Sequence, residues 1–217
     1  MITEELFLKL DKKFEKKNML ADVAFKMFLS DGYINTKIID IARKAGVGKG
    51  TVYEYFESKE SLLLFLIDTR VSREYEGLMK KVADTDGSAV EQLRTFVRME
   101  NEFISKYGRY IDDIKMQFFE ADNEIAEMIM HSIFKIVHMQ FEAVARIVEA
   151  GVQSGELCNG NIKLITTTIC SVVSSYLTAC LGISVPKEVP DEMKEMFSVF
   201  EYNEDELLNI ILHGIAA

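Results

Sequence analysis

From Thr36 to Leu64 the chain reads TKIIDIARKAGVGKGTVYEYFESKESLLL, and the rest of the chain is organised around this stretch. Ile38, Ile41 and Ala42 recur at the spacing of one helix face. Gly46 follows as the left-handed residue that ends a short helix. The stretch therefore predicts two short helices joined by a glycine turn, with a third helix after them.

The second short helix is expected to turn Val52 and Phe56 inward. Its other face is then left outward, and a helix presented in this way fits the major groove of DNA. Lys49 places a positive charge at its tip, while Gly48 and Gly50 carry no side chain that would hold the backbone away. The predicted DNA contacts are Thr36, Lys37, Gly48, Lys49, Gly50, Thr51, Tyr53, Glu54, Tyr55 and Lys59.

The predicted contacts divide between phosphates and bases. Lys49, Tyr55 and Lys59 are expected on phosphates, because ammonium and hydroxyl groups bind phosphate oxygens. Thr51 or Tyr53 is expected to approach base edges. Glu54 has two interpretations: an exposed residue that touches nothing, or an acceptor for the amino group of a cytosine.

This region resembles the N-terminal domain of the tetracycline-repressor (TetR) family of transcription regulators. The segments that carry the resemblance are AFKMFLSDGYINT, DIARKAGVGKGTVYEYF and SKESLL, at residues 24–36, 40–56 and 58–63. The family usually has Ser or Thr at the positions of Gly48 and Lys37, so this chain offers no hydroxyl to a phosphate there. The resemblance implies a homodimeric repressor that releases a palindromic operator when a small molecule binds its C-terminal domain.

Charge and composition agree with a protein that docks on DNA at one end. The chain of 217 residues has a net charge of −10, but residues 1–60 hold 11 Lys/Arg and 10 Asp/Glu. The acidic excess therefore lies beyond residue 60, which favours docking through the N-terminal part alone. Three cysteines without a C-x-x-C pair, and an acidic and lysine-rich N-terminus, predict a cytoplasmic protein.

The predicted fold is all-α in two domains. Residues 1–60 form the helix-turn-helix domain, a helix over about 58–81 links it to the rest, and residues 82–217 bind a ligand and dimerise. Beyond the linking helix, the pattern predicts helices at 90–107, broken at Gly108, and at 110–120, 123–153, 161–183 and 204–215.

Residues 1–17 form a lead with five lysines mixed among acidic residues. Either it is an N-terminal arm that touches DNA, or it is a solvated extension of the first helix, as mixed charges at helical spacing favour.

Residues 164–185 form a run of 22 residues without a charge. By length the run qualifies as a membrane span, but eight of its residues are Ser or Thr and no basic cluster flanks it. A helix buried between its own domain and a second subunit is the preferred interpretation, with no membrane partner. The predicted dimer residues are Val173, Leu177, Leu208, Ile211, Leu212 and Ile215.

The middle helices are rich in Met and aromatic residues, which suit a pocket for an apolar effector and equally suit a plain core. The pocket candidates are Met99, Phe103, Tyr107, Met116, Phe119, Met128, His131, Phe134 and Tyr176.

His131 and His138 lie seven residues apart, each four residues from a glutamate, and this pattern fits polar pairs on a helix better than a metal site. No cofactor, metal or catalytic residue is expected, because no nucleophile elbow or phosphate loop occurs. The rival hypothesis is a helical enzyme or ligand-binding protein that keeps the N-terminal fold without using it.

Overall fold

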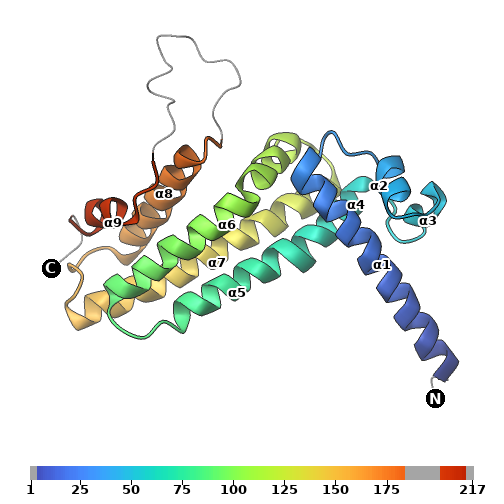
Figure 1. Ribbon diagram of the computed structural model, residues 1–217. Helices are drawn as coiled ribbons and strands as arrows, with labels where there is room; N and C mark the ends of the chain where they lie inside the picture. Colours follow the sequence, from blue (N-terminus) through green and yellow to red (C-terminus); the bar gives the residue numbers. More distant parts are fainter. Residues whose placement is uncertain (1–3, 184–200, 214–217) are drawn as a thin grey trace, which may run out of the picture. The chain divides into compact units, whose positions relative to one another are not determined.

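The computed structural model describes residues 4–183 and 201–213, and in these ranges it contains helices and no strand, as predicted. Figure 1 shows the helices in chain order. They are α1 (Glu4–Asp31), α2 (Ile38–Lys44), α3 (Lys49–Tyr53), α4 (Lys59–Leu66), the π-helical segment η1 (Ile67–Val71), α5 (Ser72–Ala83), α6 (Ala89–Phe118), α7 (Glu124–Ser154), α8 (Ile162–Cys180) and α9 (Glu204–His213).

Packing divides the chain into two compact units. Unit 1 consists of Met1–Val71 and Asp113–Ser132, and unit 2 of Ser72–Asp112 and Ile133–Ala217. Unit 1 therefore takes in a segment, 113–132, that lies inside the predicted second domain. The reason is apolar packing: the Phe118 ring lies 5.7 Å from the Tyr33 ring, and Ile114 and Ile129 are fully buried.

Unit 1 is built around small and branched side chains of α1 and α4. Leu20, Ala24, Leu62 and Leu66 are fully buried, which holds α1 against α4. Helix α4 begins at a capping box: the Ser58 hydroxyl oxygen accepts from the Ser61 amide, and the Ser58 amide donates to the Ser61 hydroxyl, both at 3.0 Å. These contacts give α2 and α3 a rigid support.

The predicted linking helix at 58–81 is a continuous helical run, with a π-helical turn inside it. Leu66 ends α4, the π segment η1 follows, and α5 begins at Ser72. Arg70 of η1 bonds the Asp22 carboxylate at 3.0 Å and the Asn18 side chain at 3.0 Å, both on α1. The π-helical turn is therefore tied to α1 within unit 1.

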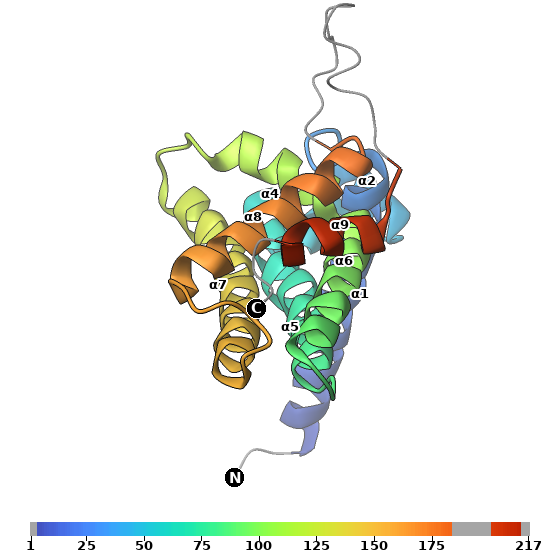
Figure 2. The same ribbon diagram turned by 90° about the vertical axis from the view of Figure 1, so that its left-hand side faces the viewer.

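In unit 2, α5 lies beside α6 and α7, and α8 packs with α9 (Figures 1 and 2). The predicted break at Gly108 is wrong, because α6 continues to Phe118. A side chain at Gly108 would place its Cβ 2.5 Å from Ile183 Cδ1, so the glycine makes room for a neighbour. The glycine that predicted a break in the helix is therefore needed for close packing of α6.

Among the described helices, α8 alone is long and apolar enough to cross a membrane by length and composition. Its side chains at Ile165, Ile169, Val173 and Leu177 are buried in unit 2. The hydroxyl of Ser174 accepts a hydrogen bond from Gln140 of α7 at 3.1 Å. These contacts integrate α8 into unit 2 as one of its packed helices.

Candidate DNA-binding surface and effector pocket

Helix α2 and the turn after it form as the glycine pattern predicts. Ile38, Ile41 and Ala42 are buried, so α2 packs through its apolar face. Gly46 has φ +69°, a conformation that side chains other than glycine rarely adopt. The amide of Val47 then donates to the carbonyl of Ala42 at 3.0 Å, which closes the turn before α3.

Helix α3 turns one face inward and leaves the other exposed. Val52 and Phe56 are buried, as predicted, at 0% and 4% exposure. Tyr53 is 43% exposed, and the Lys49 ammonium lies 5.6 Å from the centre of its ring. Lys49, Gly50 and Glu54 are also exposed, and Thr51 and Tyr55 are partly exposed. The outer face of α3 thus offers a cation, hydroxyls and bare backbone to a partner.

Gly48 and Gly50 are required neither by the backbone nor by packing. Neither has a positive φ, and a Cβ added at either position would meet no atom within 4 Å. The protein alone would therefore tolerate side chains here. Because neither glycine carries a side chain, another molecule can approach the backbone closely here, which is consistent with the predicted role in DNA binding.

Three of the predicted DNA contacts lie around the start of α2 and α4. Thr36 is buried, and its hydroxyl donates to the carbonyl of Gly32 at 2.8 Å, so it supports the fold. Lys37 is exposed at the N-cap of α2. Lys59 is partly buried: its ammonium lies 4.1 Å from the Tyr33 ring centre, and burial lowers its pKa against an opposing effect of Glu60.

The nine predicted pocket residues do not line one cavity. Phe103 and Tyr107 are buried in the core of unit 2, where the Phe103 ring lies 4.6 Å from Tyr75 and 5.1 Å from Tyr107. Tyr176 is partly exposed, accepts from the amide of Asn203 at 2.9 Å, and so holds the segment before α9. Met116, Phe119, Met128, His131 and Phe134 are exposed, and Met99 is partly exposed.

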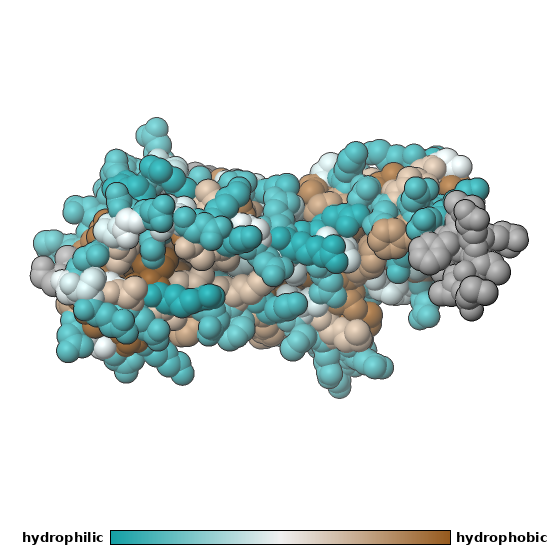
Figure 3. All heavy atoms as spheres, turned by 90° about the horizontal axis from the view of Figure 1, so that it is seen from below, coloured by the Kyte–Doolittle hydropathy of each residue, from teal (hydrophilic) through white to brown (hydrophobic). Residues whose placement is uncertain are grey.

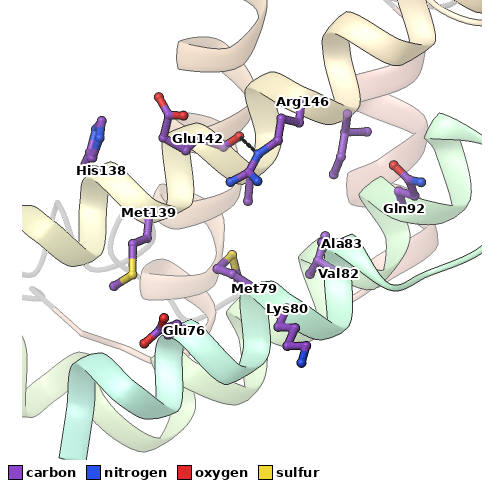
Figure 4. A pocket seen from close by; sticks show the side chains of 12 residues that line it. Glu76, Met79, Lys80, Val82, Ala83, Gln92, His138, Met139, Glu142 and Arg146 are labelled. Carbon is purple, nitrogen blue, oxygen red and sulfur yellow. Dashed lines mark hydrogen bonds between the residues drawn. The ribbon is translucent and has the colours of Figure 1, made fainter. Parts of the chain in front are cut away.

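A pocket of 590 Å³ lies elsewhere in unit 2, between α5 and α7 (Figure 4). Its apolar wall includes Met79, Val82 and Ile147, all buried. Figure 3 shows a brown, apolar hollow edged by teal side chains on the face of unit 2 seen there. The remaining lining residues are Glu76, Lys80, Ala83, Gln92, His138, Met139, Glu142, Ala143 and Arg146. Sequence reasoning missed this pocket, because its residues come from three helices with no shared motif.

Arg146 is the charged side chain best placed to bind a ligand in this pocket. Its Nε donates to the carbonyl of Glu142 at 3.0 Å, which fixes the guanidinium. In Figure 4 the guanidinium points from α7 towards Met79 on α5, whereas the Glu142 carboxylate points away. An apolar wall with a guanidinium above it suits a molecule with an apolar body and an acidic group.

Most of the predicted dimer residues pack inside the protomer. Val173, Leu177, Leu208 and Ile211 are buried within unit 2. Their side chains are therefore unavailable to a second subunit. Leu212 is partly exposed, and Ile215 lies outside the described residues. The opposite face of α8 is exposed and carries Leu164, Thr168, Ser171 and Ser175.

The described residues contain no group of three or more His, Cys, Asp or Glu side chains that could hold a metal ion. His131 is exposed and borders a separate hollow of 480 Å³ in unit 1, together with Met128 and Asp68. His138 borders the pocket of unit 2.

Residues 20–65, which span α2, α3 and most of α4, match the family described as bacterial regulatory proteins, tetR family. The chain is 22% identical to the fatty acid metabolism regulator protein of Bacillus subtilis over 168 residues, which are 77% of this chain and 84% of that protein.

Two solved structures share the fold over nearly the whole chain. The transcriptional regulator FadR of Bacillus subtilis, in complex with stearoyl-CoA, is 20% identical, with a TM-score of 0.60. The match covers 90% of this chain and 95% of that one. A TetR/AcrR-family regulator of Thermobifida fusca is also 20% identical, with a TM-score of 0.63 and coverage of 92% and 98%.

Proposed function

Because residues 20–65 match the tetR family of bacterial regulatory proteins, we propose that the chain is a homodimeric repressor that releases a palindromic operator when a small molecule binds unit 2. The observation that carries the proposal is the outer face of α3, where Lys49, Gly50 and Tyr53 are exposed on a helix whose inner face is buried. Such a helix fits the major groove from the side.

The contacts in the proposed complex divide by chemistry. Lys37, Lys49 and Tyr55 bind phosphates and set the position of α3, and Thr51 and Tyr53 approach base edges. Thr36 supports the fold instead, since its hydroxyl is satisfied internally. Lys59 has a ring and a carbonyl as partners in the free protein, so a phosphate there must compete with them.

A second copy of the chain is needed for a palindrome, because two reading helices must reach successive major grooves about 34–36 Å apart. We place the interface on the exposed face of α8. Leu164, Thr168, Ser171 and Ser175 recur there at helical spacing and carry no charge. Ile210 of α9 is 63% exposed and adds apolar area. Uncharged, small side chains let two such faces approach closely.

For the effector we propose an amphipathic acid in the 590 Å³ pocket of unit 2. Its acidic group would pair with Arg146, and its apolar part would lie on Met79, Val82 and Ile147. The stearoyl-CoA bound in the Bacillus subtilis regulator supports trying a long-chain acyl-CoA as the first probe. The effector acts only through different affinities for the DNA-bound and free states.

The first experiment compares two duplexes: the DNA upstream of the protein's own gene, and the same bases in shuffled order. Affinity for each is measured by fluorescence anisotropy at a fixed salt concentration. We expect at least about 10³-fold tighter binding to the first duplex, the lower end for specific recognition. Equal affinities for both, and for other candidate operators, would exclude a sequence-specific regulator.

A further inference from the structure

We propose that the N-terminal half of α1 forms a second contact with the DNA backbone, through Lys12, Lys13 and Lys16. Together with Glu54 and Tyr55, which directly follow α3, these lysines line a groove of 620 Å³ in unit 1, here named the lysine groove. The inference rests on the proposed function and extends it to residues that precede the family match at residue 20.

The three lysines share one side of α1. With 100° of rotation per residue, Lys12, Lys13 and Lys16 fall within about 100° of arc. The neighbouring acids Asp11 and Glu15 fall outside that arc. All three lysines are exposed, and no salt bridge joins them to an acid among the residues whose side chains the structure describes. The α1 side of the groove is therefore a concentrated positive charge.

The helix that carries these lysines is anchored beside α3. The ammonium of Lys17 lies 5.1 Å from the ring centre of Phe56 and 4.5 Å from that of Phe65. One turn further on, Arg70 bonds Asp22 at 3.0 Å, and Leu20 is fully buried. Lys12, Lys13 and Lys16 thus lie on the helical turns just before this anchor, beside Glu54 and Tyr55, which follow α3.

Like charges on one helix face repel each other, at about 0.2–0.5 kcal/mol for each neighbouring pair. The groove pairs them with a single acid, Glu54. A phosphate in the groove would remove this repulsion and release counterions from the duplex. The same position explains Glu54: its carboxylate faces lysines as well as DNA, so its repulsion by phosphate is offset.

The groove lies at the end of α3, where a duplex read by that helix presents its backbone. The phosphate strands border the major groove, which is about 12 Å wide. A helix inserted there therefore has phosphates beside its ends. The occupant that best matches the charge and place of the lysine groove is thus the phosphate backbone of the same duplex.

The test compares the wild type with the triple variant K12Q/K13Q/K16Q. Affinity for the operator and for a shuffled duplex is measured at a series of salt concentrations. Removal of one phosphate contact should lower the slope of log affinity against log salt by about 0.9. We expect the slope to fall by about two to three and both affinities to fall by the same factor, at least about tenfold at low salt.

Two further variants serve as controls. K81Q/K135Q/K163Q removes the same charge from exposed positions of unit 2 and should leave the slope unchanged. K12R/K13R/K16R keeps the charge and should retain the wild-type slope. The melting temperature of K12Q/K13Q/K16Q should be unchanged or slightly higher than that of the wild type, since repulsion between the lysines is removed.

If the salt slope of K12Q/K13Q/K16Q equals that of the wild type, the lysine groove does not contact the DNA backbone. An equal fall in K81Q/K135Q/K163Q would also overturn the proposal, because net charge alone would then explain it. The salt slope can be read on the shuffled duplex, so this outcome is separate from the failure of specific operator recognition.

Discussion

Glu100 is a carboxylate buried in the core of unit 2, at 3% exposure. The hydroxyl of Tyr75 on α5 donates to it, and Gln140 of α7 bonds it as well. Burial raises the pKa of Glu100 from the ordinary 4.5 to about 7, and the two hydrogen bonds oppose the rise only in part. Across the core, Cys170 of α8 has its pKa raised to about 12 by its own burial and by Glu100.

This raised pKa predicts a pH-dependent stability. Between about pH 4.5 and pH 7 the folded protein binds more protons at Glu100 than the unfolded chain does. The free energy of unfolding should therefore fall as pH rises through this window, by an amount on the order of 3 kcal/mol, and stay level above it. In E100Q the fall should be absent, and at about pH 8 the variant should be more stable than the wild type.

Urea denaturation at a series of pH values measures this difference. The control is E102Q, at an exposed position of the same helix, which should follow the wild-type curve. If E100Q and the wild type lose stability in parallel between about pH 4.5 and pH 7, the Glu100 carboxyl does not carry the effect.

Gly50 allows folding and DNA binding to be separated at a single residue. Glycine inside a helix costs roughly 0.5–1 kcal/mol relative to alanine, and the space around Gly50 is open. We expect G50A to raise the free energy of unfolding by about that amount and to weaken operator binding, because the new methyl group lies where the backbone meets DNA.

The matched control for G50A is G77A, an exposed helical glycine of α5 with equally open surroundings. It should gain stability in the same way without losing DNA affinity. Chemical denaturation and operator titration are measured on both variants. Full operator affinity in G50A would place Gly50 outside the DNA interface.

At the scale of single helices, α8 has one buried face and one exposed face. Ile165, Ile169, Val173 and Leu177 are buried and hold the helix within unit 2. The opposite face is exposed and uncharged. A charge introduced at Val173 would therefore disturb folding before it could report on a dimer, so an exposed position is the better place for the change.

We expect S171R to convert the proposed dimer into monomers and to weaken operator binding at the same time. A buried, unpaired charge at a twofold interface would face its own copy, which costs several kcal/mol. The control A150R adds the same charge at an exposed position of α7 and should remain dimeric.

Analytical ultracentrifugation gives the oligomeric state of S171R and A150R, and circular dichroism confirms that each is folded. A folded S171R that stays dimeric would move the interface away from the exposed face of α8. Monomers that still bind the operator tightly would remove the geometric need for a dimer.

At the scale of the whole molecule, the reading surface lies in unit 1 and the 590 Å³ pocket in unit 2. Linkage requires that an effector which prefers the free protein weakens operator affinity by the same factor by which DNA weakens effector affinity. Such coupling is typically about 1–3 kcal/mol, or roughly 5- to 150-fold.

We expect stearoyl-CoA to weaken operator binding by the wild type, and A143W to abolish that response. Ala143 lies on the pocket wall between Met139 and Ile147, so a tryptophan there fills the space. Operator affinity without effector should stay within about twofold, because the pocket residues lie in unit 2.

F119A, at a predicted pocket residue that is 71% exposed, is the control and should respond like the wild type. If A143W still responds while R146A does not, the acid group binds Arg146 but the apolar part lies elsewhere. No response of the wild type to stearoyl-CoA or to any of a panel of apolar acids would exclude this effector class.

Local sequence patterns determined most of the helices and which face of α3 is exposed. Val52 in α3 and Phe56 just after it are buried, whereas Lys49 and Gly50 are exposed, and this pattern follows from helical periodicity within a few residues of chain. The glycine turn at Gly46 is equally local, because a positive φ is a property of one residue. The all-α class and the N-terminal family likeness needed nothing more.

Which apolar residues form the core, the pocket or the outer surface depends instead on contacts between helices. Phe103 and Phe119 look alike in sequence, yet one is 5% exposed and the other 71%. The difference arises because each helix buries the face that its neighbours cover, and those neighbours lie far away in the chain. For the same reason Gly108 lies inside a helix and Arg146 projects into a pocket, since both depend on contacts between helices that periodicity does not encode.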